Sequence, residues 1–338
     1  MRILIIGGGF YGFHIAKTLF EFNNNFKIDI FEKENLPFTG AFTNNQHRLH
    51  LGFHYPRSFE TISQAKNNYN SFFKKYSPWV RIPENNIYAI HKDSLVSEMD
   101  YFNTYSDADI FIEQISEDIF EHTNLDFTNI KALFKTKEGT VDFFGISKYL
   151  TDWAKNKVNF YPNKEIRDLP KNYDITINAT YNNPNMFLNE KIPLKHELCA
   201  ILIAKNILDN NLGFTVMDGE FCSIFPMKEG GLHSVSSVTH TPYFKTNENS
   251  FSRKQIQEIY NDLNVKDKIY EHSTEFLKYN KENITSEMLS IKTKFLQDVG
   301  DTREAILKKE GNHYSIFCGK ISAICEIAEQ IKNDIRSL

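Results

Sequence analysis

The segment from Gly40 to Ser58 concentrates residues that could do chemistry. It reads GAFTNNQHRLHLGFHYPRS, in which a polar run leads into two arginines and three histidines within eleven positions. A histidine whose pKa lies near 6.5 can take a proton from an alcohol or an ammonium group. A guanidinium can bind a carboxylate or phosphate through two parallel hydrogen bonds. His50 and His54 are therefore candidate bases, while Arg48 and Arg57 either bind an anionic substrate or pair with local acids.

A glycine-rich turn near the N-terminus is the second group of interest. Gly7, Gly9 and Gly12 form a G-x-G-x-x-G sequence directly after the apolar run 2–6. In a dinucleotide site the first glycine permits a tight turn, the second lets the backbone approach a pyrophosphate, and the third lets the helix pack on the strand. Glu32, 20 residues past Gly12, would accept hydrogen bonds from the adenosine ribose and repel a 2′-phosphate, which argues against NADP. The turn alone does not distinguish FAD from NAD as the cofactor.

The elements around this turn must position it. The apolar spacing from Phe13 to Phe22 predicts a helix, which Asn23, Asn24 and Asn25 end. The stretch from Phe26 to Phe31 then alternates as a second strand that leads to Glu32. The start of such a helix offers unpaired N–H groups and the positive end of its dipole to a phosphate. Strand, turn, helix and second strand together predict a Rossmann-type unit.

The histidine segment resembles the flavin-contacting segment of the D-amino-acid oxidase superfamily, which includes glycerol-3-phosphate dehydrogenase and L-2-hydroxyglutarate oxidase. In that superfamily a small-polar run leads into an "(I/L)HxG" unit, matched here by Leu49-His50-Leu51-Gly52. An NAD-dependent dehydrogenase has no reason to carry this unit. The resemblance therefore implies non-covalent FAD as the cofactor.

Further segments resemble the same superfamily in the expected order. They are Gly139-Thr140-Val141-Asp142, the strand from Asn159 to Ile166, the strand-turn from Tyr173 to Thr180, Asp301-Thr302-Arg303 at the place of "GxRP", and Phe317 to Ser322 at the place of "GGKLT". In the strand-turn, Tyr181 stands where the family has glycine. The matches span nearly the whole chain.

The resemblance and the glycine turn imply two sets of site residues. The catalytic candidates are His50, His54, Tyr55 and Arg303, the last as the group that binds a substrate carboxylate or phosphate. The candidates for contact with the cofactor are Gly7, Gly9, Phe10, Tyr11, Gly12, Glu32, Lys33, Asn45, Arg48, His50, Ala179, Thr180, Arg303, Gly319, Lys320, Ile321 and Ser322. His240, at the end of a strand-like run, is a weaker candidate for the pocket, and no metal site is expected.

The C-terminal segment has a direct physical interpretation as well. An apolar stripe from about Ser322 to Ile335 predicts a helix, so Gly319 and Lys320 would lie at its N-terminus. The helix dipole and the lysine charge would both stabilise negative charge on the N1/O2 edge of a reduced flavin.

The remaining segments do not continue the strand–helix alternation. Four strand-like runs, at 195–204, 213–218, 221–227 and 232–240, predict an antiparallel sheet, and 251–263 and 266–279 are helical by pattern. The expected fold is α/β, with a Rossmann-type FAD-binding domain (GR2-like) interleaved with an α+β substrate domain built on an antiparallel sheet. The expected bounds are 1–80, 139–192 and 290–338 for the FAD domain, and 81–138 and 193–289 for the substrate domain.

Composition narrows the class of protein. The 338 residues are rich in aromatic side chains, so the chain should fold. Its net charge of −4 provides no positive electrostatic potential that would attract nucleic acid. No apolar run approaches the roughly 20 residues that span a bilayer, and no signal peptide is recognisable. Four scattered cysteines suggest neither a zinc cage nor a disulfide framework. We expect a soluble, cytoplasmic protein, and its richness in Asn, Lys and Ile suggests a bacterial source.

Three functions remain open at this point. The first is an FAD-dependent oxidoreductase that takes a hydride from a CH–OH or CH–NH carbon of a small anionic substrate or sugar derivative. The second is a flavin-dependent sugar-nucleotide mutase similar to UDP-galactopyranose mutase, which performs no net redox. The third is a flavin-binding protein without chemistry, which the basic residues near the expected pocket disfavour. The substrate, the acceptor that reoxidises the flavin and the oligomeric state are not determined by the sequence.

Overall fold

A six-stranded sheet forms the nucleotide-binding half of the molecule. We describe a computed structural model that covers residues 1–228, 230–248, 251–296 and 305–337. The strand order is β17-β18-β10-β1-β2-β9, in which all neighbours are parallel except the edge strand β17. The strands are β1 (Arg2–Ile6), β2 (Lys27–Phe31), β9 (Asn159–Tyr161), β10 (Ile175–Asn178), β17 (Ile306–Glu310) and β18 (His313–Phe317). Its central strands are buried on both faces, as apolar runs in parallel sheets usually are.

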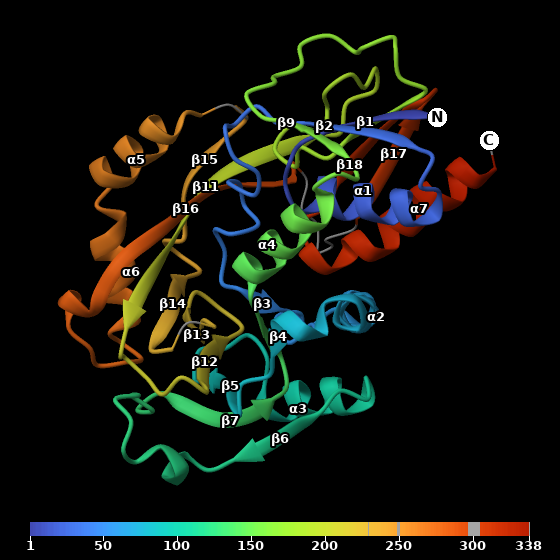
Figure 1. Cartoon of the computed structure of the whole chain (residues 1–338). Coiled ribbons are helices and arrows are strands. Elements are labelled where there is room, and N and C mark those ends of the chain that lie inside the picture. Colours follow the sequence, from blue (N-terminus) through green and yellow to red (C-terminus); the bar gives the residue numbers. More distant parts are fainter. Residues whose placement is uncertain (229, 249–250, 297–304, 338) are drawn as a thin grey trace.

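Alternate residues of β1 show how the two faces are covered. Ile3 and Ile5 belong to the largest core cluster, which includes apolar residues of the three helices on that face. These helices are α1 (Phe10–Phe22), α4 (Phe143–Ala154) and α7 (Ile324–Arg336), and α1 packs against both of the others (Figure 1). Leu4 and Ile6 point to the opposite face, where they meet loop residues that include Phe187. A further helix, α2 (Phe59–Tyr76), packs against α7.

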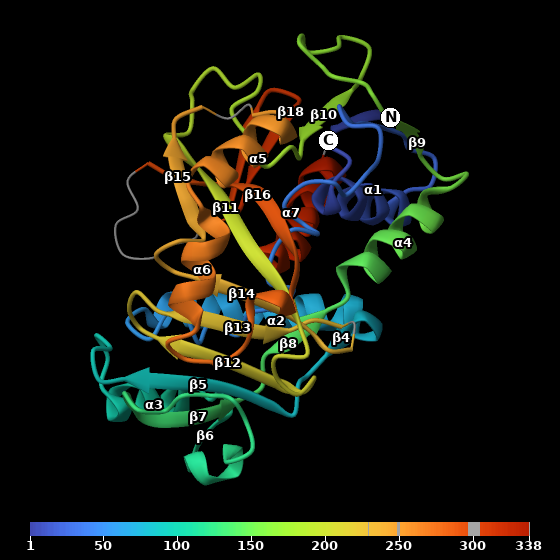
Figure 2. The ribbon, with the colours of Figure 1, turned by 90° about the vertical axis from the view of Figure 1, so that its left-hand side faces the viewer.

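The second large sheet has nine strands. Its order is β15-β11-β14-β13-β12-β5-β7-β6, and β16 pairs with the other edge of β11. The strands are β5 (Asn85–His91), β6 (Ile112–Ile115), β7 (Ile130–Thr136), β11 (Leu194–Lys205), β12 (Leu212–Met217), β13 (Cys222–Pro226), β14 (Leu232–Ser237), β15 (Pro242–Thr246) and β16 (Ile284–Phe295). The long strand β11 runs between the two halves of the molecule (Figures 1 and 2).

The helices of this half pack on its sheet. The helix α3 (Glu98–Asp107) contacts β6 and β7, while α6 (Val265–Ser273) contacts β11, β13 and β14. The helix α5 (Arg253–Asp262) packs against α6 and begins with a capping box between Ser252 and Gln255. Short 3₁₀ turns lie at Ser77–Trp79 (η1), Glu117–Phe120 (η2), Lys281–Asn283 (η3) and Ile321–Ala323 (η4).

A small three-stranded sheet lies where the chain passes between the two halves. It has the order β3-β8-β4, with β3 (Arg48–Leu49), β8 (Gly139–Val141) and β4 (Val80–Arg81). This pairing places the histidine segment, which contains β3, directly against the strand that begins at Gly139.

The predicted fold class is confirmed, with one correction. The four expected strands and the two expected helices of the second half are present, but β12 pairs in parallel with β5, so the sheet is not wholly antiparallel. The parallel pair was not expected because β5 lies in the segment 81–138 and β12 in the segment 193–289. Local patterns do not show which strands of two such distant segments will pair. The expected boundary at 289/290 falls inside β16. In the part of the chain that the structure describes, no helix is both long and apolar enough to cross a bilayer.

Candidate active site

The glycine turn adopts the geometry of a dinucleotide cradle. Gly7 has a φ of +108°, and a Cβ on it would lie 2.8 Å from the carbonyl oxygen of Ala179, so only glycine fits there. A Cβ on Gly12 would lie 2.0 Å from the carbonyl oxygen of Gly7, which shows how closely α1 packs on the turn. A Cβ on Gly9, by contrast, would meet no atom of the described residues within 4 Å. Gly9 therefore borders open space, as a backbone that receives a pyrophosphate must.

The first turn of α1 is suited to an anion. Gly9 is its N-cap, and among the described residues no side chain caps the helix or places an acid in its first turn. The first N–H groups of Phe10 and Tyr11 thus keep their hydrogen-bonding capacity, and the dipole adds positive potential there. This end of the helix is where a phosphate would be stabilised.

Glu32 lies at the tip of β2, beside the glycine turn. Its carboxylate accepts hydrogen bonds from the N–H of Gly8 at 2.6 Å and the N–H of Glu34 at 3.0 Å. These two bonds fix the carboxylate at the mouth of the cradle, while the neighbouring Lys33 is exposed. Glu32 is thus held beside the glycine turn, and its contact with a ribose stays a prediction.

The turn after β10 completes the edge of the cradle. The N–H of Ala179 donates to the carbonyl of Ile6 at 2.8 Å, and the Thr180 hydroxyl donates to Asn178 Oδ1 at the same distance. Tyr181 has a φ of +61°, the left-handed region in which bulky residues are uncommon. Tyr181 therefore occupies a backbone conformation that glycine would adopt with less strain. The Tyr181 hydroxyl accepts a hydrogen bond of 3.3 Å from the N–H of Thr293 on β16.

The C-terminal segment joins the cradle to the histidine segment. Gly319 and Lys320 precede η4, whose Ile321 and Ser322 lead into α7. The Tyr11 hydroxyl donates to the carbonyl of Lys320 at 2.5 Å. The buried Lys320 ammonium lies 4.9 Å from the centre of the Tyr55 ring. Tyr11, Lys320 and Tyr55, which are far apart in sequence, are thus brought together, whereas Arg303 lies outside the described residues.

The polar run before the histidines shapes its own loop. The Asn45 amide donates to the carbonyls of Ala41 and Phe42 and accepts from the N–H of His47. His47 is buried, with a φ of +56° and its ring 4.9 Å from that of Phe143. Asn45 and His47 thus hold the backbone that carries the next residues, which gives both a structural function.

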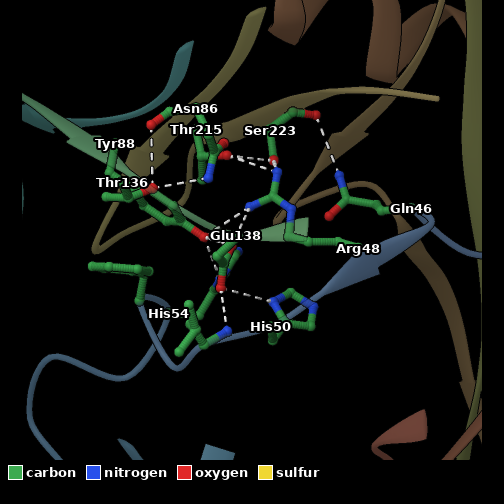
Figure 3. A network of polar contacts seen from close by, with 12 residues as sticks. Gln46, Arg48, His50, His54, Asn86, Tyr88, Thr136, Glu138, Thr215 and Ser223 are labelled. Atoms are coloured by element: carbon green, nitrogen blue, oxygen red, sulfur yellow. Dashed lines mark hydrogen bonds and ion pairs between the residues drawn. The ribbon is translucent and has the colours of Figure 1, made fainter. Parts of the chain in front are cut away.

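Arg48 lies on β3, and its buried side chain reaches the second sheet. Its guanidinium donates to the hydroxyls of Tyr88 at 2.8 Å and of Thr215 and Ser223, both at 2.9 Å, and it lies 3.6 Å from Glu138 (Figure 3). It also stacks on Phe225, with the guanidinium carbon 3.9 Å from the ring centre. Of the two functions considered for Arg48, the structure shows pairing with a local acid. The side chain of this candidate cofactor contact extends into the second sheet, where Tyr88, Thr215 and Ser223 accept its hydrogen bonds.

Arg57 and His240 lie in other surroundings. Arg57 is exposed and pairs with Asp218 at 3.2 Å, so it too has a local acid as its partner. His240 lies on the α6 side of the sheet, where its ring is 5.7 Å from that of His272 and its N–H donates to Ser237. No contact of the described residues places His240 in the cluster around Glu138.

Glu138 is a candidate site residue that the sequence did not predict. It is fully buried, and it accepts hydrogen bonds from the N–H of Leu51 at 2.7 Å and from the Tyr88 hydroxyl at 2.5 Å. Burial alone would raise the pKa of this carboxyl, but His50, Arg48 and Tyr88 together outweigh it and hold the pKa below its usual value. Glu138 is therefore a carboxylate at neutral pH. Its one sequence signal is its place directly before the Gly139 segment, which resembles the family.

His50 and His54 converge on this carboxylate. Nδ1 of His50 lies 3.8 Å from Glu138 Oε1, and Nδ1 of His54 lies 3.0 Å from the Tyr88 oxygen (Figure 3). The two rings are perpendicular, with centres 4.8 Å apart, and both side chains are half-buried. Two imidazoles oriented by one buried carboxylate can accept and hold protons.

The same three residues could be considered as metal ligands. Ligand atoms of His50, His54 and Glu138 lie within 4.8 Å of one another. Both carboxylate oxygens of Glu138 already accept hydrogen bonds, and the Arg48 guanidinium lies against one of them. A cation would have to displace these bonds and sit beside a fixed positive charge, so the arrangement favours proton transfer over metal binding.

Comparisons with known proteins give relatives by sequence and neighbours by structure. No family model matches the chain. The FAD-dependent monooxygenase FPY4 of Fusarium mangiferae is 27% identical over 97% of this chain and 89% of its own length. The L-alpha-glycerophosphate oxidase of Mycoplasma pneumoniae, solved with FAD bound, superposes with a TM-score of 0.71 at 14% identity, over 98% of this chain and 94% of that one. The glycine oxidase of Geobacillus kaustophilus superposes with a TM-score of 0.68 at 12% identity, over 100% and 94%.

The chain has the fold of the D-amino-acid oxidase superfamily. The predicted resemblance is thereby confirmed at the level of the fold. The relative by sequence and the neighbour solved with its cofactor both use FAD, in agreement with the cofactor predicted from the sequence.

Proposed function

We propose that this chain is an FAD-dependent oxidoreductase that takes a hydride from a CH–OH or CH–NH carbon of a small anionic substrate. The observation that carries the proposal is the contact chain Tyr11–Lys320–Tyr55, which links the nucleotide cradle to the histidine segment. A dinucleotide that only bound at the glycine turn would not need this link. A flavin dinucleotide would contact both the nucleotide cradle and the histidine segment, because its ADP and its ring system lie at opposite ends of one molecule.

The residues present fit FAD. The open space at Gly9 and the first N–H groups of α1 would hold the pyrophosphate, and Glu32 would accept from the ribose hydroxyls. Lys320, at the start of η4, would stabilise negative charge on the pyrimidine edge of the ring. The bound flavin would accept the hydride of the substrate. We expect it to be held without a covalent bond.

The protein must provide a proton acceptor and a group that binds the substrate. His50 and His54 are the candidate acceptors, since removal of a hydride from an alcohol or ammonium carbon also releases a proton. Arg303 remains the proposed partner of a substrate carboxylate or phosphate, by its resemblance to the "GxRP" arginine. Arg48 and Arg57 are paired with Glu138 and Asp218.

The first experiment measures the cofactor. The purified protein should be yellow, and acid precipitation should release about one equivalent of FAD and leave a colourless pellet. FMN is the matched control for the apoprotein, because it carries the same ring system but lacks the ADP that the cradle would bind. A colourless protein that retains only NAD, or an apoprotein that binds FMN as tightly as FAD, would refute the proposed site.

The second experiment measures the direction of electron flow. Anaerobic addition of glycine, L-proline or sn-glycerol 3-phosphate should bleach the flavin if one of them is an adequate probe. NADPH alone should not, if electrons come from the substrate. Bleaching by NADPH but by none of the probes would instead favour the monooxygenase chemistry for which FPY4 is named. The mutase alternative predicts turnover of a sugar nucleotide without consumption of any electron acceptor.

A further inference from the structure

The Tyr88 hydroxyl is the junction of the buried network. Its oxygen lies 2.5 Å from Glu138 Oε2, 2.8 Å from Arg48 Nη1 and 3.0 Å from His54 Nδ1 (Figure 3). A phenolic oxygen has one proton to donate and two lone pairs that accept. The guanidinium of Arg48 can only donate, so it uses one lone pair. One proton and one lone pair remain for Glu138 and His54.

The charge of Glu138 decides how they are shared. Its Oε1 accepts from the Leu51 N–H, and the depressed pKa described above keeps the group ionised. A carboxylate can only accept, so the Tyr88 proton must point to Glu138. If it pointed to His54 instead, two bare oxygens would face each other at 2.5 Å. The remaining lone pair of Tyr88 therefore accepts a proton that His54 carries on Nδ1.

We propose that Glu138 and Tyr88 hold neutral His54 as its Nδ1–H tautomer, so that Nε2 is the nitrogen that accepts the substrate proton. The assignment of the proton acceptor rests on the proposed function, whereas the tautomer follows from the network alone. Glu138 and Tyr88 are positioning residues, because they act through His54. His50 faces the same carboxylate at 3.8 Å, a longer contact than the 3.0 Å between His54 and Tyr88.

The proton and electron balance of the reaction is simple. The substrate would lose a hydride, with its two electrons, from C–H to a bound flavin, and a proton from O–H or N–H to His54 Nε2, which would leave a C=O or C=N bond. The imidazolium so formed still donates through Nδ1 to Tyr88, which donates to the carboxylate of Glu138. The negative charge of Glu138 thus stabilises the positive charge that forms on His54.

The test is histidine NMR of the intact, flavin-loaded protein labelled with ¹⁵N-histidine. Two-bond ¹H–¹⁵N correlations distinguish the two neutral tautomers, and the signal that disappears in His54→Asn assigns the residue. We expect the Nδ1–H pattern for His54. An Nε2–H pattern in the unmodified protein would overturn the proposal.

Glu138→Gln is the decisive variant, because it should reverse the tautomer. The Leu51 N–H requires an acceptor at the Oε1 position, so the glutamine would place its NH₂ at the Oε2 position, facing Tyr88. Tyr88 would then accept from both Arg48 and the amide, and its own proton would turn to His54 Nδ1. The signal should change to the Nε2–H pattern. An unchanged Nδ1–H pattern in this variant would contradict the proposed relay.

Two further variants distinguish the hydrogen-bond chain from Glu138 through Tyr88 to His54 from a general disturbance of the buried network. Tyr88→Phe removes the acceptor and should give a mixture of tautomers. Thr215→Val removes a different hydrogen bond of Arg48 and should leave the His54 signal unchanged. Loss of the Nδ1–H pattern in Thr215→Val would overturn the assignment to Tyr88. A protein without FAD would refute the proposed function, whereas a yellow protein with Nε2–H His54 would refute only this inference.

Discussion

Glu32 shows how one side chain can serve both the fold and the cofactor. Its carboxylate already accepts from two backbone N–H groups, so it is held in place before any ligand arrives. A preformed acceptor loses little conformational freedom on binding, and its hydrogen bonds to a ribose should contribute fully.

Replacing Glu32 with Ala should weaken FAD binding. Loss of one hydrogen bond to a charged group costs about 1.5–3 kcal/mol, which corresponds to a rise of roughly 10- to 160-fold in the Kd for FAD. Fluorescence titration of the apoprotein with FAD measures this change. Glu34→Ala is the control, because Glu34 bonds to Glu32 through its backbone N–H, which alanine keeps, and an equal loss of affinity in both variants would show that loop order is responsible.

Replacing Arg303 with Lys tests the proposed substrate anion. The charge is kept but the two-pronged hydrogen bonding is lost, so the KM for the substrate should rise about tenfold or more, or about 1.4 kcal/mol, with little change in flavin reduction at saturation. Arg57→Lys is the matched control, since Arg57 is paired with Asp218. An unchanged KM in Arg303→Lys, or a true substrate without negative charge, would remove Arg303 from the site.

The β1–α1–β2 unit separates the two functions of its glycines. Gly12 keeps the helix against the turn, whereas Gly9 keeps open the space in front of it. The first is a packing requirement and the second a binding requirement. Substitution of each by alanine should therefore have different consequences.

Gly9→Ala should leave the apoprotein folded, because φ is −86° and the new methyl meets no described atom within 4 Å, but FAD affinity should fall at least tenfold. Gly12→Ala should instead lower the free energy of unfolding of the apoprotein by about 1–3 kcal/mol, as overpacking does. Urea unfolding and FAD titration of both variants measure the two effects. Equal stability of the two apoproteins would contradict this division.

The elements differ in how well a sequence pattern predicts them. The nucleotide unit was predictable because its strand, turn and helix follow one another within 32 residues, and the structure begins α1 at Phe10, three residues before the expected start. The parallel pairing of β5 with β12 joins residues more than a hundred positions apart, and no local periodicity reports it.

The candidate site was predictable only in part, for the same reason. His50 and His54 stood out because they lie in one short segment that resembles a known family. Glu138 did not, because a single acid has no spacing to recognise and its partners Arg48 and Tyr88 come from other strands. The position of Arg48 also shows that a residue within a conspicuous segment can be structural.

At the scale of the whole molecule, a buried histidine makes the stability of the fold depend on pH. His14 lies on α1, and its Nδ1 is 2.5 Å from the Tyr76 hydroxyl of α2. Burial, and then the charges of Lys75 and Lys17, lower the pKa of His14 to about 3. Below pH 6.5 the unfolded chain takes up a proton there that the folded chain refuses, so stability falls as the pH falls.

His14→Gln should remove this component. Between pH 7 and pH 5 the free energy of unfolding should fall by about 2 kcal/mol more in the unmodified protein than in the variant. Urea unfolding at the two pH values measures the difference, with His122→Gln as an exposed control. Identical pH dependence of the unmodified protein and His14→Gln would contradict the assignment of a neutral, buried His14.

The six-stranded sheet also has a consequence for biosynthesis. Its central strand β10 is completed by β18, and α1 packs against α7, which ends at Arg336. At about 5–20 residues per second, the ribosome needs roughly 15–65 s to deliver the last of these partners after the first strand has emerged. During that interval the apolar face of α1 lacks its contact with α7, and the edge of β10, once that strand has been made, lacks β18. Nascent chains of this protein should therefore expose apolar surface to which holding chaperones can bind during synthesis.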